Sequence, residues 1–429
     1  MFRNTFLALL ILGASVGEVC PAPSRVVLQD NLTSTWFTVT YSNTTNVSGG
    51  GGALQTAVNG AGSSTRLLIT DSLTYDPVQV SSCTDLTIEA DSGQQPVIKR
   101  ASPPHNTSGW VMRLSGVIDG FAVRGLTFMG NGNRNQLSFY DDGLFSVRWD
   151  TCTSGDRIIV ENCSFAEDGT DNANSGPGVF IGGTSGVHHL RVWVNACTFT
   201  NNANGSAATP NGYGACTVVG YDEVWIQNCS VTRTDAVVAR GSSHMRGFAV
   251  NNNSTVIEDC LAYDLGTAGS NEAFKHVASF GSESTNGPVT IRNCVAYRAK
   301  RGYREDHPNQ SMTITNSVYH TDLTGILDKV FRLDNSGTSM TVTDCVAVGA
   351  GDGTCFSSTS ITESFNDIYN FGTVGKTLAA SDLTVDPGFT DVGSRNWIAT
   401  TASVQTGASD GGAMGVRYPG GTTIIWAGH

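Results

Sequence analysis

The chain has 429 residues, of which 14% are charged, and its formal net charge is −12. That charge argues against general binding of nucleic acid or anionic membranes, but it is compatible with a local basic patch for an acidic ligand. The 50 glycines and the lack of long Glu-, Lys- and Ala-rich stretches favour short strands joined by turns.

Residues 1–19 are predicted to be an export signal. Arg3 supplies the positive charge, and residues 6–16 form an apolar run that is too short to span a membrane. We therefore expect no transmembrane segment and a protein that is secreted, periplasmic or on the cell surface. The alternative is an uncleaved N-terminal strand in a protein of a virion.

Four segments are expected in chain order. After the signal, residues 20–52 form an N-terminal segment that ends in a Gly-rich linker, with residues 43–53 as a flexible connector. Residues 53–372 form a repeat domain that opens with a short amphipathic helix over 53–62, because the first coil of a solenoid needs a cap. Residues 373–429 form a C-terminal cap segment.

A six-residue pattern recurs along the middle of the chain. The pattern begins with an apolar residue and a polar residue. The third position is usually Asn or Asp, the fourth is Cys or Ser, and the last two begin a strand-like alternation. The intervals between repeats vary from 23 to 34 residues, which is typical of a solenoid with loops of different length. The Cys or Ser positions are Cys163, Cys197, Cys229, Cys260, Cys294, Ser317 and Cys345.

The pattern has a physical interpretation. Residues 289–292, Val-Thr-Ile-Arg, alternate as a strand with one buried face. Asn and Asp tolerate left-handed backbone and suit a bend, while the small Cys suits a tight interior corner. Stacked coils then give an Asn ladder and a ladder of mostly free buried thiols. Cysteines 20, 83, 152, 216 and 355 lie off this ladder, and a pair of them could be oxidised after export.

Together these features predict an all-β, right-handed, single-stranded parallel β-helix of about 9–11 coils. Residues 53–98, with the strand-like stretch 86–90, and the closing stretch 386–415 resemble the pectate-lyase-like β-helix superfamily. The resemblance covers roughly residues 53–415. It implies the fold more than an activity, because the superfamily includes lyases, hydrolases, epimerases, phage tailspikes and binding proteins.

The segment 271–310 is unusually basic for this chain. On a β-helix, residues one coil apart lie side by side, so Lys275 is expected near Arg301 or Arg304. A uronate lyase needs such a set, because a cation must neutralise the substrate carboxylate and a base of lowered pKa must remove the adjacent proton. Five of its cations fall within residues 292–304, namely Arg292, Arg298, Lys300, Arg301 and Arg304.

Resemblance to pectate, alginate and chondroitin lyases of this fold implies roles for these residues. Lys275 would be the base, and Arg301 or Arg304 would bind substrate or act as acid. Residues 303–308 resemble in position a catalytic loop of alginate epimerases, with Asp-His-Pro-Asn in place of Asp-Pro-His-Asp, which adds His307 to the catalytic candidates. The candidate substrate-binding residues are His244, Arg246, His276, Arg298 and Tyr303.

Two further features have alternative interpretations. The acidic loop with Glu167, Asp168 and Asp171 has oxygen ligands of the kind Ca²⁺ prefers, but it also suits a plain turn. Trp193 and Trp225 fall at related positions in successive coils, where they would stack on sugar rings if exposed or on each other if buried.

Three classes of function remain open. The first is an exported polysaccharide lyase that cleaves an acidic, uronate-containing glycan by β-elimination. The second is a viral or phage particle protein such as a tailspike, commonly a trimer. The third is a glycan-binding or structural surface solenoid, in which Glu272, Glu305 and Asp306 neutralise the basic cluster.

Overall fold

The structure is a computed structural model. Residues 1–37, including the expected signal, lie outside the described residues, as do the side chains of 148–154, 167, 204–205, 244–245 and 266. The residues that it describes are 38–99, 110–130, 144–167, 177–182, 191–202, 204–205, 214–232, 244–266, 271–277, 287–325, 327–335, 337–392 and 396–416.

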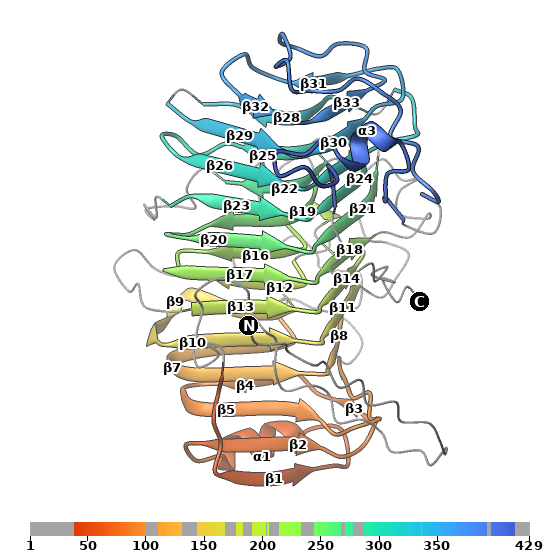
Figure 1. The fold of residues 1–429 in the computed structure, drawn as a ribbon. Helices are drawn as coiled ribbons and strands as arrows, with labels where there is room; N and C mark the ends of the chain where they lie inside the picture. Colours follow the sequence, from red (N-terminus) through yellow and green to blue (C-terminus); the bar gives the residue numbers. More distant parts are fainter. Residues whose placement is uncertain are drawn as a thin grey trace, which may run out of the picture.

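The described chain is a right-handed parallel β-helix, as predicted (Figure 1). Each full coil contributes three short strands, and each strand pairs in parallel with its counterparts in neighbouring coils. The strands therefore form three stacks that run the length of the molecule. We call them the first, second and third stacks.

The first stack precedes the Asn–Cys corner of each coil. It contains β1 (Asn43–Val47), β2 (Thr65–Ile69), β5 (Cys83–Ala90), the end of β7 (Met112–Arg124), β10 (Arg157–Glu161), β13 (Arg191–Asn195), β17 (Glu223–Gln227), β20 (Thr255–Glu258), β23 (Val289–Arg292), β26 (Ser311–Thr315), β29 (Ser339–Thr343) and β32 (Thr362–Ser364).

The second stack follows that corner and is a separate 11-stranded sheet. It contains β3 (Thr74–Tyr75), β6 (Val97–Lys99), β8 (Thr127–Gly130), β11 (Ser164–Glu167), β14 (Thr198–Thr200), β18 (Ser230–Thr232), β21 (Leu261–Gly266), β24 (Val295–Ala299), β27 (Val318–His320), β30 (Val346–Val348) and β33 (Asp367–Tyr369).

The third stack completes each coil. The long strand β7 pairs with β4 (Val78–Val80) and β9 (Phe145–Gly155) in the third stack and with β5 and β10 in the first, which joins the two stacks into one sheet. A short strand, β15 (Asn204–Gly205), pairs antiparallel with β19. The remaining strands of the stack are β12 (Val179–Gly182), β16 (Cys216–Val219), β19 (His244–Asn251), β22 (Glu272–His276), β25 (Arg301–Glu305), β28 (Lys329–Leu333) and β31 (Thr354–Phe356).

The Asn–Cys corner has the backbone that the sequence predicts. Asn162, Asn228 and Asn293 have φ of 52°, 52° and 55°, which is the left-handed region. Ala196 holds the same corner position in its coil, with φ of 51°. Left-handed backbone is strained for alanine and better tolerated by Asn, so this coil lacks the corner Asn that its neighbours have.

The interior is filled by ladders of like residues. Phe248, Phe274 and Tyr303 stack in successive coils of the third stack, with ring centroids 5.3 and 5.2 Å apart. The predicted Cys ladder is buried, and its thiols are free. Each ladder thiol donates to the carbonyl two residues earlier, as Cys229 does to Gln227 at 3.1 Å. Off the ladder, Cys216 and Cys355 are also free thiols, and the Sγ of Cys83 lies 3.9 Å from the Gly120 carbonyl oxygen.

The N-terminal end corrects one expectation. A cap helix, α1 (Ala53–Gly60), forms as predicted. The expected flexible connector 43–53, however, contains a strand, because Asn43–Val47 pairs in parallel with Thr65–Ile69. The glycines after it turn the chain towards the helix, with φ of 101° at Gly49. The sequence Asn-Thr-Thr-Asn-Val has no apolar alternation that would predict this strand, because only Val47 is buried.

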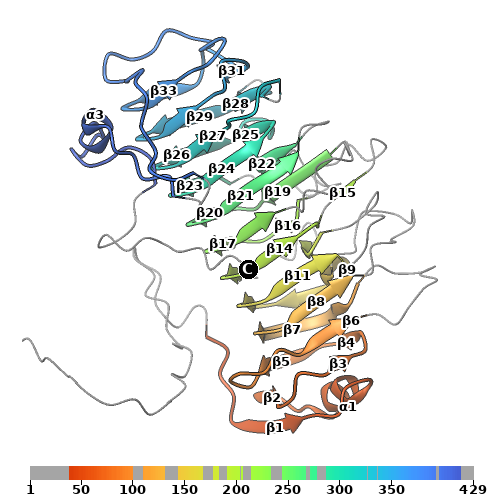
Figure 2. The ribbon, with the colours of Figure 1, turned by 90° about the vertical axis from the view of Figure 1, so that its right-hand side faces the viewer.

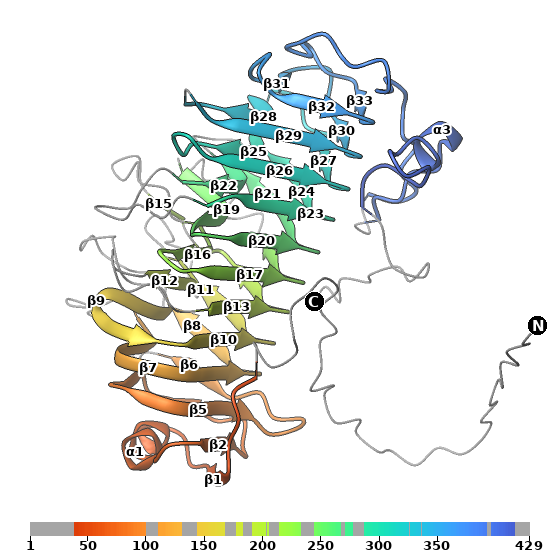
Figure 3. The same cartoon turned by 60° about the vertical axis from the view of Figure 1, so that its left-hand side comes forward.

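The C-terminal part has two roles. Thr373 and Leu383 form bridges with the last coils. The chain then folds back along the outside of the second stack, where the short helix α3 (Ala402–Gln405) lies near the C-terminal end of the solenoid (Figures 2 and 3). Buried residues of this C-terminal segment, such as Trp397 and Met414, share a hydrophobic cluster with outward-facing residues of the second stack, such as Val295 and Val346. No helix among the described residues is long and apolar enough to cross a membrane.

Candidate functional site

Part of the basic segment, Lys275, Arg301 and Arg304, gathers with Arg246 on the outer side of the third stack, over β19, β22 and β25. The stacked aromatic rings of this stack fix the register, so that Lys275 pairs with Arg304. In the same way Glu272 lies between Arg246 of the preceding coil and Arg301 of the following one. The expected neighbourhood of Lys275 and Arg304 is thus confirmed.

A buried carboxylate lies at the centre of this cluster. Glu272 has 0% exposure, and it accepts hydrogen bonds from Arg246 Nε at 2.7 Å, Arg301 Nη1 at 2.9 Å and Arg304 Nη1. Burial by itself raises the pKa of Glu272, but the charges of Arg246, Lys275 and Arg304 outweigh it and hold the pKa well below its usual range. Glu272 is therefore an anion at neutral pH, and it organises the cations around it.

Lys275 is a lysine with a perturbed pKa. Burial and the charge of Arg246 lower the pKa to about 8, and Arg304 adds to this effect while Glu272 and Asp306 oppose it. Its Nζ lies 3.1 Å from Asp306 Oδ2 and 3.9 Å from Glu272 Oε2. A neutral amine is thus accessible near physiological pH, as a general base requires.

An outer row of acids borders the same cations. Asp328 Oδ2 accepts from Arg301 Nη2 at 2.8 Å, and Asp334 Oδ2 accepts from Arg304 Nε at 2.7 Å. Burial raises the pKa of Asp334, but hydrogen bonds and charges from Arg332 and Arg304 bring it below its usual value. The sequence prediction missed Asp328, Arg332 and Asp334, because only the register of β28 brings them to the cluster.

His276, Glu305 and His307 form a buried support beside the cluster. His276 Nδ1 is 2.8 Å from Glu305 Oε2, and both side chains have 0% exposure. The other Glu305 oxygen accepts from the backbone N–H of His307 at 2.8 Å, and the two histidine rings stack with centroids 5.2 Å apart. Burial lowers the pKa of His307, although the Pro308 carbonyl partly opposes it. These residues fix the end of β25 rather than face solvent.

Other candidates lie elsewhere. Arg298 belongs to β24 in the second stack, where its Nε and Nη2 each lie 2.7 Å from Asp322. Tyr303 points into the core and donates its hydroxyl hydrogen to the Val318 carbonyl at 3.0 Å. His244 begins β19, but its side chain lies outside the described residues.

The remaining two predictions have different outcomes. Asp168, Asp171 and the side chain of Glu167 lie outside the described residues. Elsewhere in the described ranges, no group of three or more His, Cys, Asp or Glu side chains could hold a metal ion. Trp193 is buried beside Val39 of the N-terminal segment, so it does not offer a ring to a sugar.

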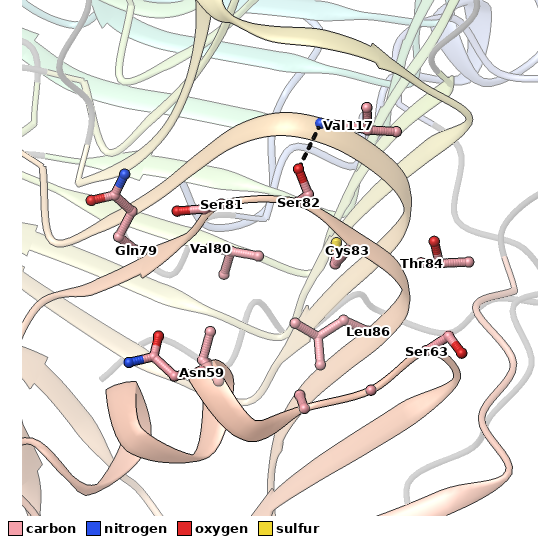
Figure 4. Close-up of a pocket in the computed structure, with 13 residues that line it drawn as sticks. Asn59, Ser63, Gln79, Val80, Ser81, Ser82, Cys83, Thr84, Leu86 and Val117 are labelled. Atoms are coloured by element: carbon pink, nitrogen blue, oxygen red, sulfur yellow. Dashed lines mark hydrogen bonds between the residues drawn. The ribbon is translucent and has the colours of Figure 1, made fainter.

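A cavity of about 480 Å³ opens at the N-terminal end, between α1 and the strands β4, β5 and β7 (Figure 4). Its walls are neutral, with hydroxyls and amides such as Ser63, Ser81 and Asn59 beside Val80 and Leu86. A cavity without a lining cation does not suit an acidic polymer, so the charged cluster of the third stack is the better candidate site.

Comparisons with known proteins give structural similarities but no sequence match. No protein family and no curated protein matches the sequence. Three solved structures are similar. Pectate lyase Pel9A is 12% identical with a TM-score of 0.46, covering 90% of this chain and 91% of its own. A polygalacturonase from Erwinia carotovora ssp. carotovora is 10% identical with a TM-score of 0.45, covering 85% and 98%. An alginate lyase from Paenibacillus sp. strain FPU-7 is 12% identical with a TM-score of 0.36, covering 68% and 98%.

Proposed function

We propose that this protein binds a uronate-containing polysaccharide over β19, β22, β25 and β28 and cleaves it by β-elimination, with Lys275 as the base. The observation that carries this proposal is a lysine whose pKa is lowered to about 8 by burial and by neighbouring arginines. Perturbed pKa values of this kind gather at functional sites. The export signal expected over residues 1–19 would bring the enzyme to such a polymer outside the cell.

The proposed reaction follows from these charges. Arg304, with Arg301 behind it, neutralises the sugar carboxylate, which acidifies the adjacent C5–H bond. The neutral amine of Lys275 takes the C5 proton, a double bond forms between C4 and C5, and the C4–O bond breaks. The leaving oxygen takes a proton from solvent. Lys275 and Arg304 lie opposite each other on the paired strands β22 and β25 of adjacent coils.

Calcium does not fit this cluster. The carboxylates of Glu272, Asp306, Asp328 and Asp334 are each bonded to arginine or lysine, so their oxygens are already neutralised. A cation would have to displace these partners. We therefore propose a metal-independent elimination at Lys275.

The test measures the ultraviolet absorbance of unsaturated uronate while the protein is incubated with alginate, pectate, chondroitin or hyaluronan, with Ca²⁺ or with chelator. We expect one polymer to give product, and Lys275→Ala to abolish it. Lys300→Ala is the matched control, since Lys300 follows β24 outside this cluster. Product formation that survives Lys275→Ala contradicts the assigned base, and absence of product from every polymer contradicts the lyase.

A second candidate is a glycan-binding solenoid without catalysis. The observation that favours it is that Arg246, Arg301 and Arg304 already share the buried Glu272. Such a protein would migrate more slowly in gels that contain the polymer and would release no unsaturated product. Gel migration and the absorbance assay together therefore separate the two functions.

A further inference from the structure

Asp306 bridges the two cations to which the proposed reaction assigns roles. Its Oδ2 lies 3.1 Å from Lys275 Nζ and 3.1 Å from Arg304 Nη2. The Asp306 side chain is 20% exposed, against 5% for Lys275 and 14% for Arg304. One carboxylate oxygen of the protein therefore already contacts both the lysine that the proposed reaction uses as base and the arginine that it uses to bind the sugar carboxylate.

The surroundings of Asp306 hold its backbone more firmly than its side chain. Its N–H donates to the His276 carbonyl at 3.1 Å, and its own carbonyl accepts from Asn335 Nδ2. The preceding Glu305 is fixed by its bonds to His276 and to the His307 N–H. Apart from the two cations, the carboxylate accepts a long hydrogen bond from Asn335 at 3.4 Å. Rotation of the side chain alone therefore breaks the bonds of Asp306 to Lys275 and Arg304, while Glu272 stays close to both cations.

We propose that Asp306 is an internal carboxylate that occupies the subsite of the substrate carboxylate until an acidic sugar displaces it. This inference rests on the proposed function. A neutral sugar would replace Asp306 without restoring its negative charge, which would leave Lys275 with the more distant carboxylate of Glu272, at 3.9 Å in place of 3.1 Å. A uronate restores the carboxylate bond to Arg304 and brings its C5 proton to the amine of Lys275. Asp306 thus keeps Lys275 covered in the free protein and makes entry selective for acidic sugars.

The test compares Asp306→Asn with wild type by calorimetric titration, using oligogalacturonate and oligomannuronate as probes. Removing the competing negative charge is expected to tighten binding of the matching uronate roughly tenfold, as for close charge pairs in general. Asp334→Asn is the matched control, since it bonds Arg304 but has no bond to Lys275. It is expected to change the affinity less than about twofold, because the sugar carboxylate does not take the place of Asp334.

A second readout needs no glycan. Trinitrobenzene sulfonate should label Lys275 faster in Asp306→Asn than in wild type, with the peptide identified by mass spectrometry and the fold checked by circular dichroism. Equal or weaker binding by Asp306→Asn, or unchanged labelling, overturns the role of Asp306 alone. If neither protein binds any uronate, the proposed function itself fails, and this inference fails with it.

Discussion

At the scale of single residues, a buried carboxylate and its cations control one another. Glu272 is an anion because Arg246, Lys275 and Arg304 hold its pKa low, and the pKa of Lys275 is lowered by burial and by the charges of Arg246 and Arg304. In a site of low dielectric, each charge sets the protonation of the next. Changing one member should therefore alter the others in a direction that can be stated in advance.

Glu272→Gln should destabilise the fold. The change leaves Arg246 and Arg304 with a buried partner that no longer balances their charge. Breaking a buried pair in this way costs about 3–5 kcal/mol. Glu258→Gln is the control, since Glu258 pairs with Arg292 near solvent and its loss should cost under about 1 kcal/mol. Denaturant unfolding of both variants measures the difference, and equal losses would contradict a central role for Glu272.

The pH dependence of cleavage should follow Lys275. The active form is the neutral amine, so the rate should rise with pH and level off above a midpoint near 8. Arg246→Gln removes a charge that lowers this pKa, and the midpoint should move to higher pH. Arg292→Gln, in the first stack, should leave the midpoint where it is. Initial rates across pH at saturating polymer test this, and an unmoved midpoint in Arg246→Gln argues against Lys275 as base.

At the scale of the elements, local chemistry was readable from the sequence and the register between coils was not. Asn at the corner and Cys after it are properties of each coil, so Asn228 and Cys229 were assigned correctly. Arg298 lies only five residues after the corner at Asn293, which puts it in the second stack rather than beside Lys275. Asp334 lies at the site because the loop between β25 and β28 has the length that brings β28 into register with β25. No residue pattern in the sequence predicts that register.

The corner at Ala196 tests whether Asn is preferred at the left-handed position of each coil. Its φ of 51° is costly for alanine, whereas Asn162 and Asn228 hold the equivalent position in the adjacent coils. Ala196→Asn should stabilise the protein by about 1 kcal/mol, because left-handed backbone costs a residue with a Cβ about 1–2 kcal/mol and Asn recovers part of it. Asn228→Ala should destabilise by a similar amount. Thermal unfolding measures both, and a loss in both variants would refute the rule.

At the scale of the whole molecule, the second stack changes character along its length. Its outward positions are Thr127, Ser164, Thr198 and Ser230 in the earlier coils, and these side chains are partly exposed. From the next coil onwards the same positions become Leu261, Val295, Val318 and Val346, which the C-terminal segment buries. The apolar outer face thus begins where a covering segment is available.

Removing the C-terminal segment should leave the solenoid folded but prone to self-association. Ending the chain after residue 385 exposes the strip that Trp397, Val404 and Met414 cover, and exposed apolar patches of this kind drive association. We expect larger species by light scattering and more binding of a hydrophobic dye, with the β-sheet circular dichroism retained. Restoring the hydroxyl pattern of the earlier coils, with Val295→Thr and Val318→Thr in the shortened chain, should reduce both signals. If the shortened chain stays monomeric, or if these two changes have no effect, the strip is not what the C-terminal segment protects.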